Sequence, residues 1–209
     1  MNLLPPPQLI LEHLGIFVAA ITGVLAARGK GVDLFGVLVL ALVTSFGGGT
    51  TRDLLVGDLP VVWLRSPWYL VNASAVAVLT FVICRFRALP EKVLLIADAF
   101  TLAFFTMLGA EKGVMREFSA PVIVLLGVVT GVAGGIFRDV LLGTVPMVFR
   151  AEIRLYATAA LCGSLAYVAL NAYGIAGPTA VAIGAAVVLV LRLAAIYWKI
   201  SLPIFQARE

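Results

Sequence analysis

Long apolar segments separated by short charged loops occupy almost the whole of this 209-residue chain. With 62% hydrophobic and only 12% charged residues, the chain has more apolar surface than a 22.1 kDa globule can bury. A membrane-spanning helix needs about 20 mostly apolar residues to cross roughly 30 Å of hydrocarbon. Seven segments satisfy this requirement: 9–27, 34–57, 67–84, 91–110, 119–143, 153–170 and 177–198. The sequence therefore predicts an all-α integral membrane protein, with seven transmembrane helices in a single transmembrane domain that covers residues 1–209.

The Lys and Arg residues fall mainly on one side of the predicted membrane domain. Of the 15 basic residues, eleven belong to the side of the first, third and fifth loops and the C-terminal end, and four to the other side. Cytoplasmic loops are enriched in Lys and Arg, so we expect a multi-pass protein of the inner (plasma) membrane, with the N-terminus outside and the C-terminus in the cytoplasm. The basic residues form no stripe, so the net charge of +4 indicates the lipid bilayer and no nucleic acid as a partner.

The chain repeats itself at an offset of 86 residues. The segment "GGGTTRDLLVGDLP" at 47–60 aligns with "AGGIFRDVLLGTVP" at 133–146, with seven identities in 14 positions, where chance gives about one. Spans one to three (9–84) therefore correspond to spans four to six (91–170), and the span 177–198 stands alone. Because a three-helix unit crosses the membrane an odd number of times, its copy inserts upside down, as an inverted-topology repeat.

Clusters of glycine lie about two-thirds of the way along the second and fifth spans. Glycine costs about 1 kcal/mol relative to alanine inside a helix, so these clusters are expected to break both helices near the membrane midplane and to line an ion or solute pathway. The predicted break residues are Gly47, Gly48, Gly49, Gly134 and Gly135. Small residues spaced four apart, such as Gly127 and Gly131, also permit close helix packing, and this alternative stays open.

Five hydroxyl residues beside the glycines are candidate oxygen ligands for a permeating ion. They are Thr44, Ser45, Thr50, Thr51 and Thr130. In membrane helices such hydroxyls also commonly donate to a carbonyl of the preceding turn, so a purely local role is the alternative.

An arginine and an aspartate follow each glycine cluster: Arg52 and Asp53 in the first repeat, Arg138 and Asp139 in the second. A charge inside the membrane marks a candidate functional site, here a charged pore wall or gate. Neighbours on a helix point about 100° apart, so we expect partners elsewhere. One possibility is cross-pairing between the repeats, Arg52 with Asp139 and Arg138 with Asp53.

Two further acidic residues, Glu12 and Asp98, occupy matched positions near the starts of the first and fourth spans. They are candidate partners of the two arginines and candidate pore mouths, or else interfacial charges.

A local alternative for Asp53 is a capping box with Thr50 at the start of a second half-helix. The second repeat has Ile136 at the position of Thr50, so capping does not account for both copies.

The patterns of the common catalytic and metal sites are missing from the sequence. No G-x-x-x-x-G-K-[ST] or H-E-x-x-H spacing occurs, and His13 is the single histidine. Cys84 and Cys162 lie in apolar runs without metal-type spacing and are interpreted as small buried residues. We therefore expect no enzyme, no cofactor and no bound metal other than a transient monovalent cation.

The doubled motif GG-x-x-RD-x-L-x-G-x-x-P, in a chain of about 200 residues with seven spans, resembles the prokaryotic branch of the trimeric intracellular cation (TRIC) channels. The resemblance covers residues 8–200. Members of that family are homotrimers with one pore in each protomer, selective for monovalent cations, chiefly potassium, and lined by the kinked second and fifth helices. It implies a potassium channel in which the two glycine clusters form the kinks and the Arg-Asp pairs lie beside the pore.

Two observations qualify this resemblance. The first motif has three glycines and the second has Ala133-Gly134-Gly135, so the halves are not equivalent. An arginine beside a cation path repels the ion unless it is paired, which suggests that Arg52 and Arg138 are neutralised or act as a gate.

The same signature has also been labelled a glycine-transporter domain in bacteria. A secondary transporter of a small solute such as glycine is therefore the alternative function.

Overall fold

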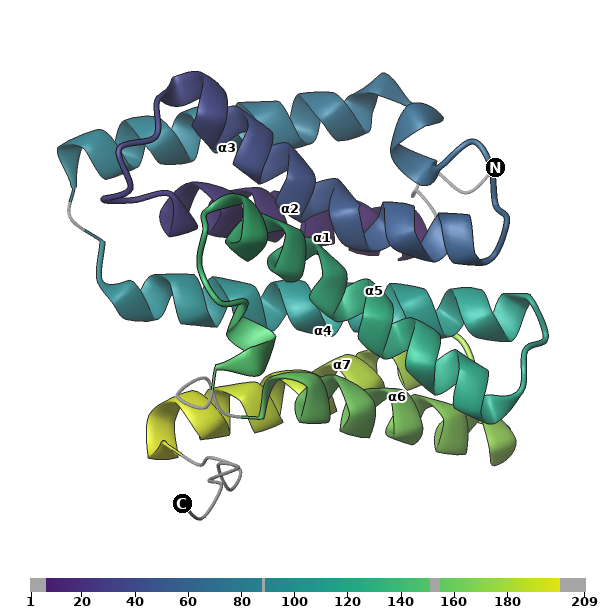
Figure 1. Ribbon diagram of the computed structural model, residues 1–209. Helices are drawn as coiled ribbons and strands as arrows, with labels where there is room; N and C mark the ends of the chain where they lie inside the picture. Colours follow the sequence, from purple (N-terminus) through teal and green to yellow (C-terminus); the bar gives the residue numbers. More distant parts are fainter. Residues whose placement is uncertain (1–6, 88, 151–154, 200–209) are drawn as a thin grey trace, which may run out of the picture.

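The computed structural model describes residues 7–87, 89–150 and 155–199, which form seven α-helices and two short 3-10 helices (Figure 1). In chain order these are α1 (Pro7–Ala26), α2 (Leu34–Leu55), η1 (Val62–Leu64), α3 (Pro67–Phe86), α4 (Glu91–Met115), α5 (Ala120–Leu141), η2 (Met147–Phe149), α6 (Tyr156–Ala172) and α7 (Pro178–Trp198). The predicted all-α class is confirmed.

Six of the seven helices are long and apolar enough to span a membrane, judged by length and composition. The exception is α6, an apolar helix of 17 residues, which at 1.5 Å per residue is about 25 Å long. Residues 153 and 154 of the corresponding predicted span lie outside the described residues.

The same C-terminal motif ends α2 and α5 and explains two of the repeated glycines. Gly57 and Gly143 have φ angles of +66° and +63°, in the left-handed region that glycine adopts without steric cost. After α2, the amide of Asp58 donates to the carbonyl of Asp53 at 2.8 Å, and the amide of Gly57 donates to Leu54 at 3.3 Å. These are the two bonds of a Schellman motif, and the second repeat forms the same pair.

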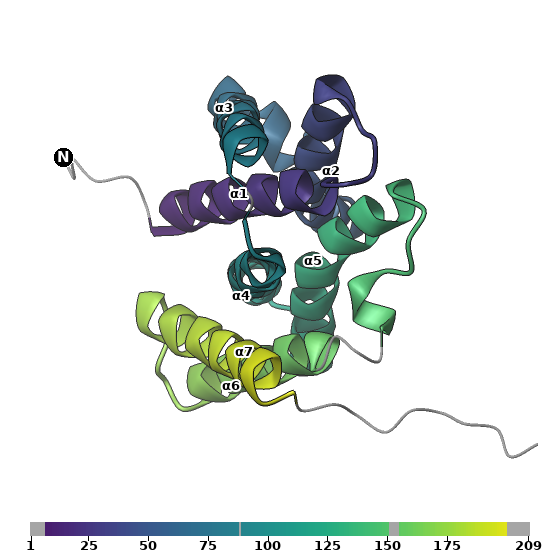
Figure 2. The ribbon, with the colours of Figure 1, turned by 90° about the vertical axis from the view of Figure 1, so that its left-hand side faces the viewer.

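The helices surround α4, which Figure 2 shows nearly end-on in the centre of the bundle. Of the residues in its apolar span, 67% are buried, against 28% in the spans of α3 and α7. The first three helices pack on one another, as do α4, α5 and α6, and the two groups meet where α1 contacts α4 and α2 contacts α5. The seventh helix packs on α4 and α6. The arrangement is that of two three-helix repeats with α7 added to the second.

The glycine clusters do not break the helices. The second helix runs without interruption through Gly47, Gly48 and Gly49, and the fifth through Gly134 and Gly135. The predicted breaks are therefore wrong, although Figure 2 shows α5 changing direction part-way along its length. Each backbone N–H in a membrane needs a hydrogen-bond partner, and an unbroken helix supplies that partner itself. The helix is therefore favoured over a break where the glycines also gain contacts with another helix.

The glycines supply that contact, because α2 and α5 cross at a distance that leaves no room for a side chain. A Cβ built on Gly48 would lie 2.1 Å from the carbonyl oxygen of Thr130, and one on Gly134 would lie 2.4 Å from that of Thr44. The two contacts are reciprocal, since Thr44 and Thr130 are equivalent at the repeat offset. The packing alternative is thus confirmed at this crossing.

Candidate functional site

Each arginine of the repeated motif forms an ion pair with the aspartate that follows it. The Nε atoms of Arg52 and Arg138 donate to Oδ1 of Asp53 and Asp139, each at 2.8 Å, and all four residues are at most 3% exposed. The predicted cross-pairing between repeats is wrong, as is the expectation that sequence neighbours do not face each other. The arginine side chain is long enough to turn back over the next residue of its own helix.

The other carboxylate oxygen of each aspartate binds the chain after the helix. Oδ2 of Asp53 accepts from the amide of Val62 at 2.9 Å, and Oδ2 of Asp139 accepts from Met147 at 2.7 Å. The aspartates thereby tie α2 to η1 and α5 to η2. The capping-box interpretation is wrong, because Asp53 lies in the last turn of an unbroken helix, and the Thr50 hydroxyl instead accepts from Nε1 of Trp63 at 3.1 Å.

A buried cluster joins α4, α5, α6 and α7 around Asp98. Its Oδ1 accepts from Nη1 of Arg138 at 3.3 Å and from the Tyr156 hydroxyl at 3.2 Å, and its Oδ2 accepts from Nη2 of Arg192 at 3.5 Å. The predicted pairing of Arg138 with Asp98 is confirmed. Arg192 and Tyr156 are not among the residues predicted from the sequence. The signal available for Arg192 is that it is the single basic residue within the apolar span of α7.

Glu12, the counterpart of Asp98, has a different neighbourhood. Its Oε2 accepts from the Tyr69 hydroxyl at 2.7 Å, and the ring of His13 stacks on that of Tyr69 with centroids 4.7 Å apart. In the described part of the chain, the predicted ion pair of Arg52 with Glu12 is not formed. The guanidinium of Arg52 is turned toward Asp53, with both Nε and Nη2 at 2.8 Å from Oδ1.

A vestibule of about 260 Å³ opens between α1, α3, α4 and the end of α2. It is lined by Gln8, Glu12, Arg52, Val62, Arg65, Ser66, Tyr69, Leu108, Glu111, Lys112 and Met115. Beside it, Asp58 binds three basic side chains: Arg65 at 2.8 Å, Arg116 at 3.3 Å, and Lys112. Hydrogen bonds from Lys112 and Arg65 lower the pKa of Asp58 to about 2, so this carboxylate stays ionised down to strongly acidic pH.

Two small cavities continue inward from the vestibule. One of about 20 Å³ shares Glu12 and Arg52 with the vestibule and is also lined by Ser45, Gly49 and Asp53. The next, of about 10 Å³, shares Phe105 with the previous one. Its lining includes Thr44, Gly48, Asp98, Thr130, Gly134, Gly135 and Tyr156. The three cavities form a row from Glu12 to Asp98 that reaches the crossing of α2 and α5 at the innermost cavity, and most of the predicted site residues line it.

The hydroxyl groups along this row, and that of the neighbouring Thr51, are largely committed to local bonds. Thr44 and Thr130 each donate to the carbonyl four residues earlier at 2.6 Å, and Thr51 does so to Gly47 at 2.8 Å. Ser45 donates across to the Ile16 carbonyl of α1 at 3.2 Å. The local alternative is therefore confirmed for the three threonines, whose oxygens still have lone pairs free to accept.

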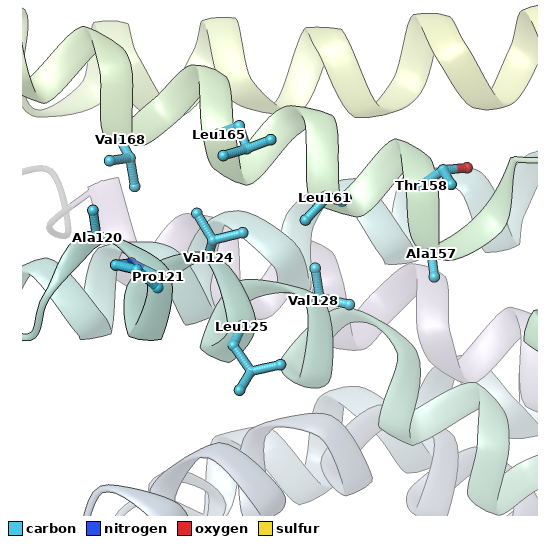
Figure 3. A pocket seen from close by; sticks show the side chains of 10 residues that line it. All are labelled: Ala120, Pro121, Val124, Leu125, Val128, Ala157, Thr158, Leu161, Leu165 and Val168. Carbon is cyan, nitrogen blue, oxygen red and sulfur yellow. The ribbon is translucent and has the colours of Figure 1, made fainter.

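A separate apolar groove of about 590 Å³ lies between α5 and α6 (Figure 3). Its lining comes from the first half of α5, such as Val124 and Leu125, and from one face of α6, such as Leu161 and Leu165. Thr158 supplies the one hydroxyl among these lining side chains. The groove therefore offers no charged chemistry and is distinct from the row of cavities.

Together these features define a multi-pass α-helical membrane protein with two inverted three-helix repeats and buried charge clusters along the contact of the repeats. Comparison with known proteins agrees with this description. A family model described as "Glycine transporter" matches the chain twice, over residues 9–85 and 95–172. The chain is 43% identical over 201 residues to the UPF0126 inner membrane protein YadS of Escherichia coli K12, covering 95% of this chain and 96% of YadS.

Solved structures of TRIC channels have the same fold. The TRIC orthologue from Rhodobacter sphaeroides superposes with a TM-score of 0.85 at 36% identity, covering 92% of this chain and 98% of the orthologue. A second TRIC cation channel, solved in a study of conductance, also gives a TM-score of 0.85, at 34% identity, covering 96% of this chain and 98% of that channel. The chain belongs to the prokaryotic TRIC family, and it is related over almost its whole length to the UPF0126 membrane proteins.

Proposed function

We propose that the protein is a homotrimeric channel for potassium and other monovalent cations, with a pore in each protomer lined by α2 and α5. The observation that carries the proposal is the row of cavities from Glu12 to Asp98. Residues with carboxylate and hydroxyl side chains line it, and oxygens of this kind can replace the hydration shell of a permeating cation. The relatives of known structure are cation channels, which favours a channel over an enzyme.

The charge at the first inner cavity favours cations. The charged residues that line the 20 Å³ cavity are Glu12, Asp53 and Arg52, which sum to −1. Because Arg52 is paired with Asp53 at 2.8 Å, its charge is neutralised locally and does not oppose a cation at Glu12. This pairing supports a place for Arg52 in the pore wall, and the pairing of Arg138 with Asp139 at 2.8 Å supports an equivalent place for Arg138 behind the innermost cavity.

The conformation described here is closed in this proposal. A cavity of about 20 Å³ or 10 Å³ holds about one water molecule, and Phe105 separates the two. Phe46 lines the outer of these cavities and stacks on Trp63 with ring centroids 5.3 Å apart. Conduction then requires these aromatic side chains to move, which couples opening to the packing of α2 against α4.

The protein would lie in the inner membrane with its N-terminus outside and its C-terminus in the cytoplasm, as the distribution of Lys and Arg indicates. Apolar side chains such as Phe35, Phe86 and Val190 are 64–78% exposed in the single chain. In the proposed trimer such surfaces face acyl chains or the neighbouring protomers, and the groove of Figure 3 belongs to this apolar exterior.

The alternative is a secondary transporter of a small zwitterion such as glycine, which the description of the matching family model favours. The vestibule carries both Glu12 and Glu111 and the basic Arg65 and Lys112, so it presents partners for an amine and a carboxylate. Against it, Arg65 and Lys112 are already bound to Asp58. A transporter predicts saturable uptake of labelled glycine into proteoliposomes without unitary currents.

The test of the channel proposal is single-channel recording of the purified protein in planar bilayers. Glu12→Gln removes the negative charge of the first inner cavity, so unitary potassium conductance should fall severalfold. Glu117→Gln is the matched control, because Glu117 lies in an exposed turn after α4, and its conductance should equal that of the wild type. Equal conductance in Glu12→Gln and wild type would rule out this pathway.

A further inference from the structure

The seventh helix places the cationic side chain of Arg192 against the buried carboxylate of Asp98 in the second repeat. Nη2 of Arg192 lies 3.5 Å from Oδ2 of Asp98, and its guanidinium lies over the ring of Tyr156, 4.6 Å from the ring centre. Arg192 and Asp98 are 0% and 1% exposed. Because α7 has no counterpart in the first repeat, nothing in the internal symmetry of the fold requires this arginine.

The acidic centres of the two repeats share two features. In each, a tyrosine hydroxyl donates to the carboxylate: Tyr69 to Glu12 at 2.7 Å, and Tyr156 to Asp98 at 3.2 Å. In each, a buried Arg-Asp pair from the crossing helix lies beside it. The centres differ in two ways among the described residues: Arg138 also bonds Asp98 at 3.3 Å, whereas Arg52 makes no ion pair with Glu12, and α7 adds the guanidinium of Arg192 at Asp98.

The charge sums differ by this one guanidinium. Counting only the carboxylate and the Arg-Asp pair beside it, Glu12, Asp53 and Arg52 sum to −1 in the first centre. In the second, Asp98 and Asp139 balance Arg138 and Arg192, so the sum is zero. A partly buried centre with a net negative charge favours uptake of one cation, whereas a neutral centre does not.

We infer that Asp98 is a second monovalent-cation site of the pathway and that the guanidinium of Arg192 is a tethered cation that occupies it. The inference rests on the proposed cation channel. Asp98 and Tyr156 both line the innermost cavity of the row, together with Thr44 and Thr130. A cation that has passed Phe105 therefore arrives at a carboxylate already neutralised by the protein, and Arg192 limits conduction until its guanidinium moves.

The experiment removes the guanidinium group of Arg192 by substitution and supplies free guanidinium ion in solution. Arg192→Ala leaves the centre at Asp98 with a charge of −1 and with space where the guanidinium lay. We expect a severalfold increase in potassium conductance of the full-length protein in planar bilayers. Millimolar guanidinium should return the variant to the wild-type conductance, because the free ion occupies the same site. Arg87→Ala, at the exposed end of α3, is the matched control and should change neither property.

Protein stability supplies a second readout that does not depend on current. Millimolar guanidinium should raise the midpoint of thermal unfolding of Arg192→Ala in detergent and leave that of the wild type unchanged, since ligands stabilise the state that binds them. Arg192→Met, which keeps the length of the side chain without its charge, should respond to guanidinium less than Arg192→Ala. If the wild type conducts no current but guanidinium stabilises Arg192→Ala, the cation site stands and the channel proposal fails.

Three results would overturn the inference. Arg192→Ala could conduct as the wild type does, which would mean that the guanidinium does not limit permeation. It could lose its current and its fold without recovery in guanidinium, which would assign Arg192 to structure alone. Guanidinium could block or stabilise wild type and variant equally, which would place its binding elsewhere.

Discussion

The crossing of α2 and α5 predicts opposite effects for alanine at two adjacent glycines. At Gly48 a Cβ would lie 2.1 Å from the carbonyl oxygen of Thr130, far inside van der Waals contact. At Gly49 the nearest atom to a Cβ is Nη2 of Arg52, at 3.9 Å, which is an ordinary contact. Both positions lie in the same continuous helix, so their helix propensities change by the same amount.

The two substitutions should therefore differ by several kcal/mol. Alanine improves helix propensity by about 1 kcal/mol at either position, and Gly49→Ala should keep much of that gain. At Gly48 a backbone must move by about an ångström to relieve the clash, and overpacking of this kind costs about 1–3 kcal/mol or more. The contact on Thr130 is with backbone, so no side chain can rotate away, and the upper part of that range applies.

The assay is reversible denaturant unfolding of the purified protein in mild detergent, read by circular dichroism. Gly48→Ala should lower the free energy of unfolding, and Gly49→Ala should leave it unchanged or raise it. Gly134→Ala should behave as Gly48→Ala, because its Cβ would meet the Thr44 carbonyl at 2.4 Å. Equal stability of Gly48→Ala and Gly49→Ala would refute the close crossing and return the glycines to a role in flexibility.

The remaining predictions concern two carboxylates. Asp139→Asn removes one charged partner of Arg138 and weakens the hydrogen bond to the amide of Met147. The free energy of unfolding should therefore fall by about 3–5 kcal/mol. The control is Asp33→Asn, which keeps a helix cap and should leave the free energy of unfolding almost unchanged. Asp58 has a pKa lowered from 3.8 to about 2, so its stabilising effect is complete above pH 4 and lost as the pH falls toward 2. In Asp58→Asn, the part of the acid destabilisation between pH 4 and 2 that comes from this group should disappear from pH-dependent unfolding curves.

The sequence predicts the architecture because membrane spans and internal repeats are properties of order along the chain. Apolar runs of about 20 residues identify helices without knowledge of their neighbours. The identity of residues 47–60 and 133–146 at seven positions relates the halves before any contact is known. The repeat also places Glu12 and Asp98 at matched positions, and it indicates correctly that the crossing helices meet at their glycines.

The pairing of charged side chains cannot be predicted from apolar runs and the internal repeat, because it depends on side-chain rotamers and on helices outside the repeat. The direction of Cβ on an ideal helix excludes Arg52 facing Asp53, yet the flexible arginine turns back over its neighbour. The glycines suggest breaks by propensity alone, although the clash distances at Gly48 show that packing decides. Arg192 belongs to α7, where no repeated partner directs attention to it.

The most direct measurement of the central claim is the reversal potential of the wild-type protein in a planar bilayer under a potassium chloride gradient. A cation-selective pore predicts unitary currents that reverse near the potassium equilibrium potential, about 59 mV for each tenfold ratio of concentration. Currents that reverse at the chloride potential would contradict the account. So would the absence of current from protein that accumulates labelled glycine in proteoliposomes.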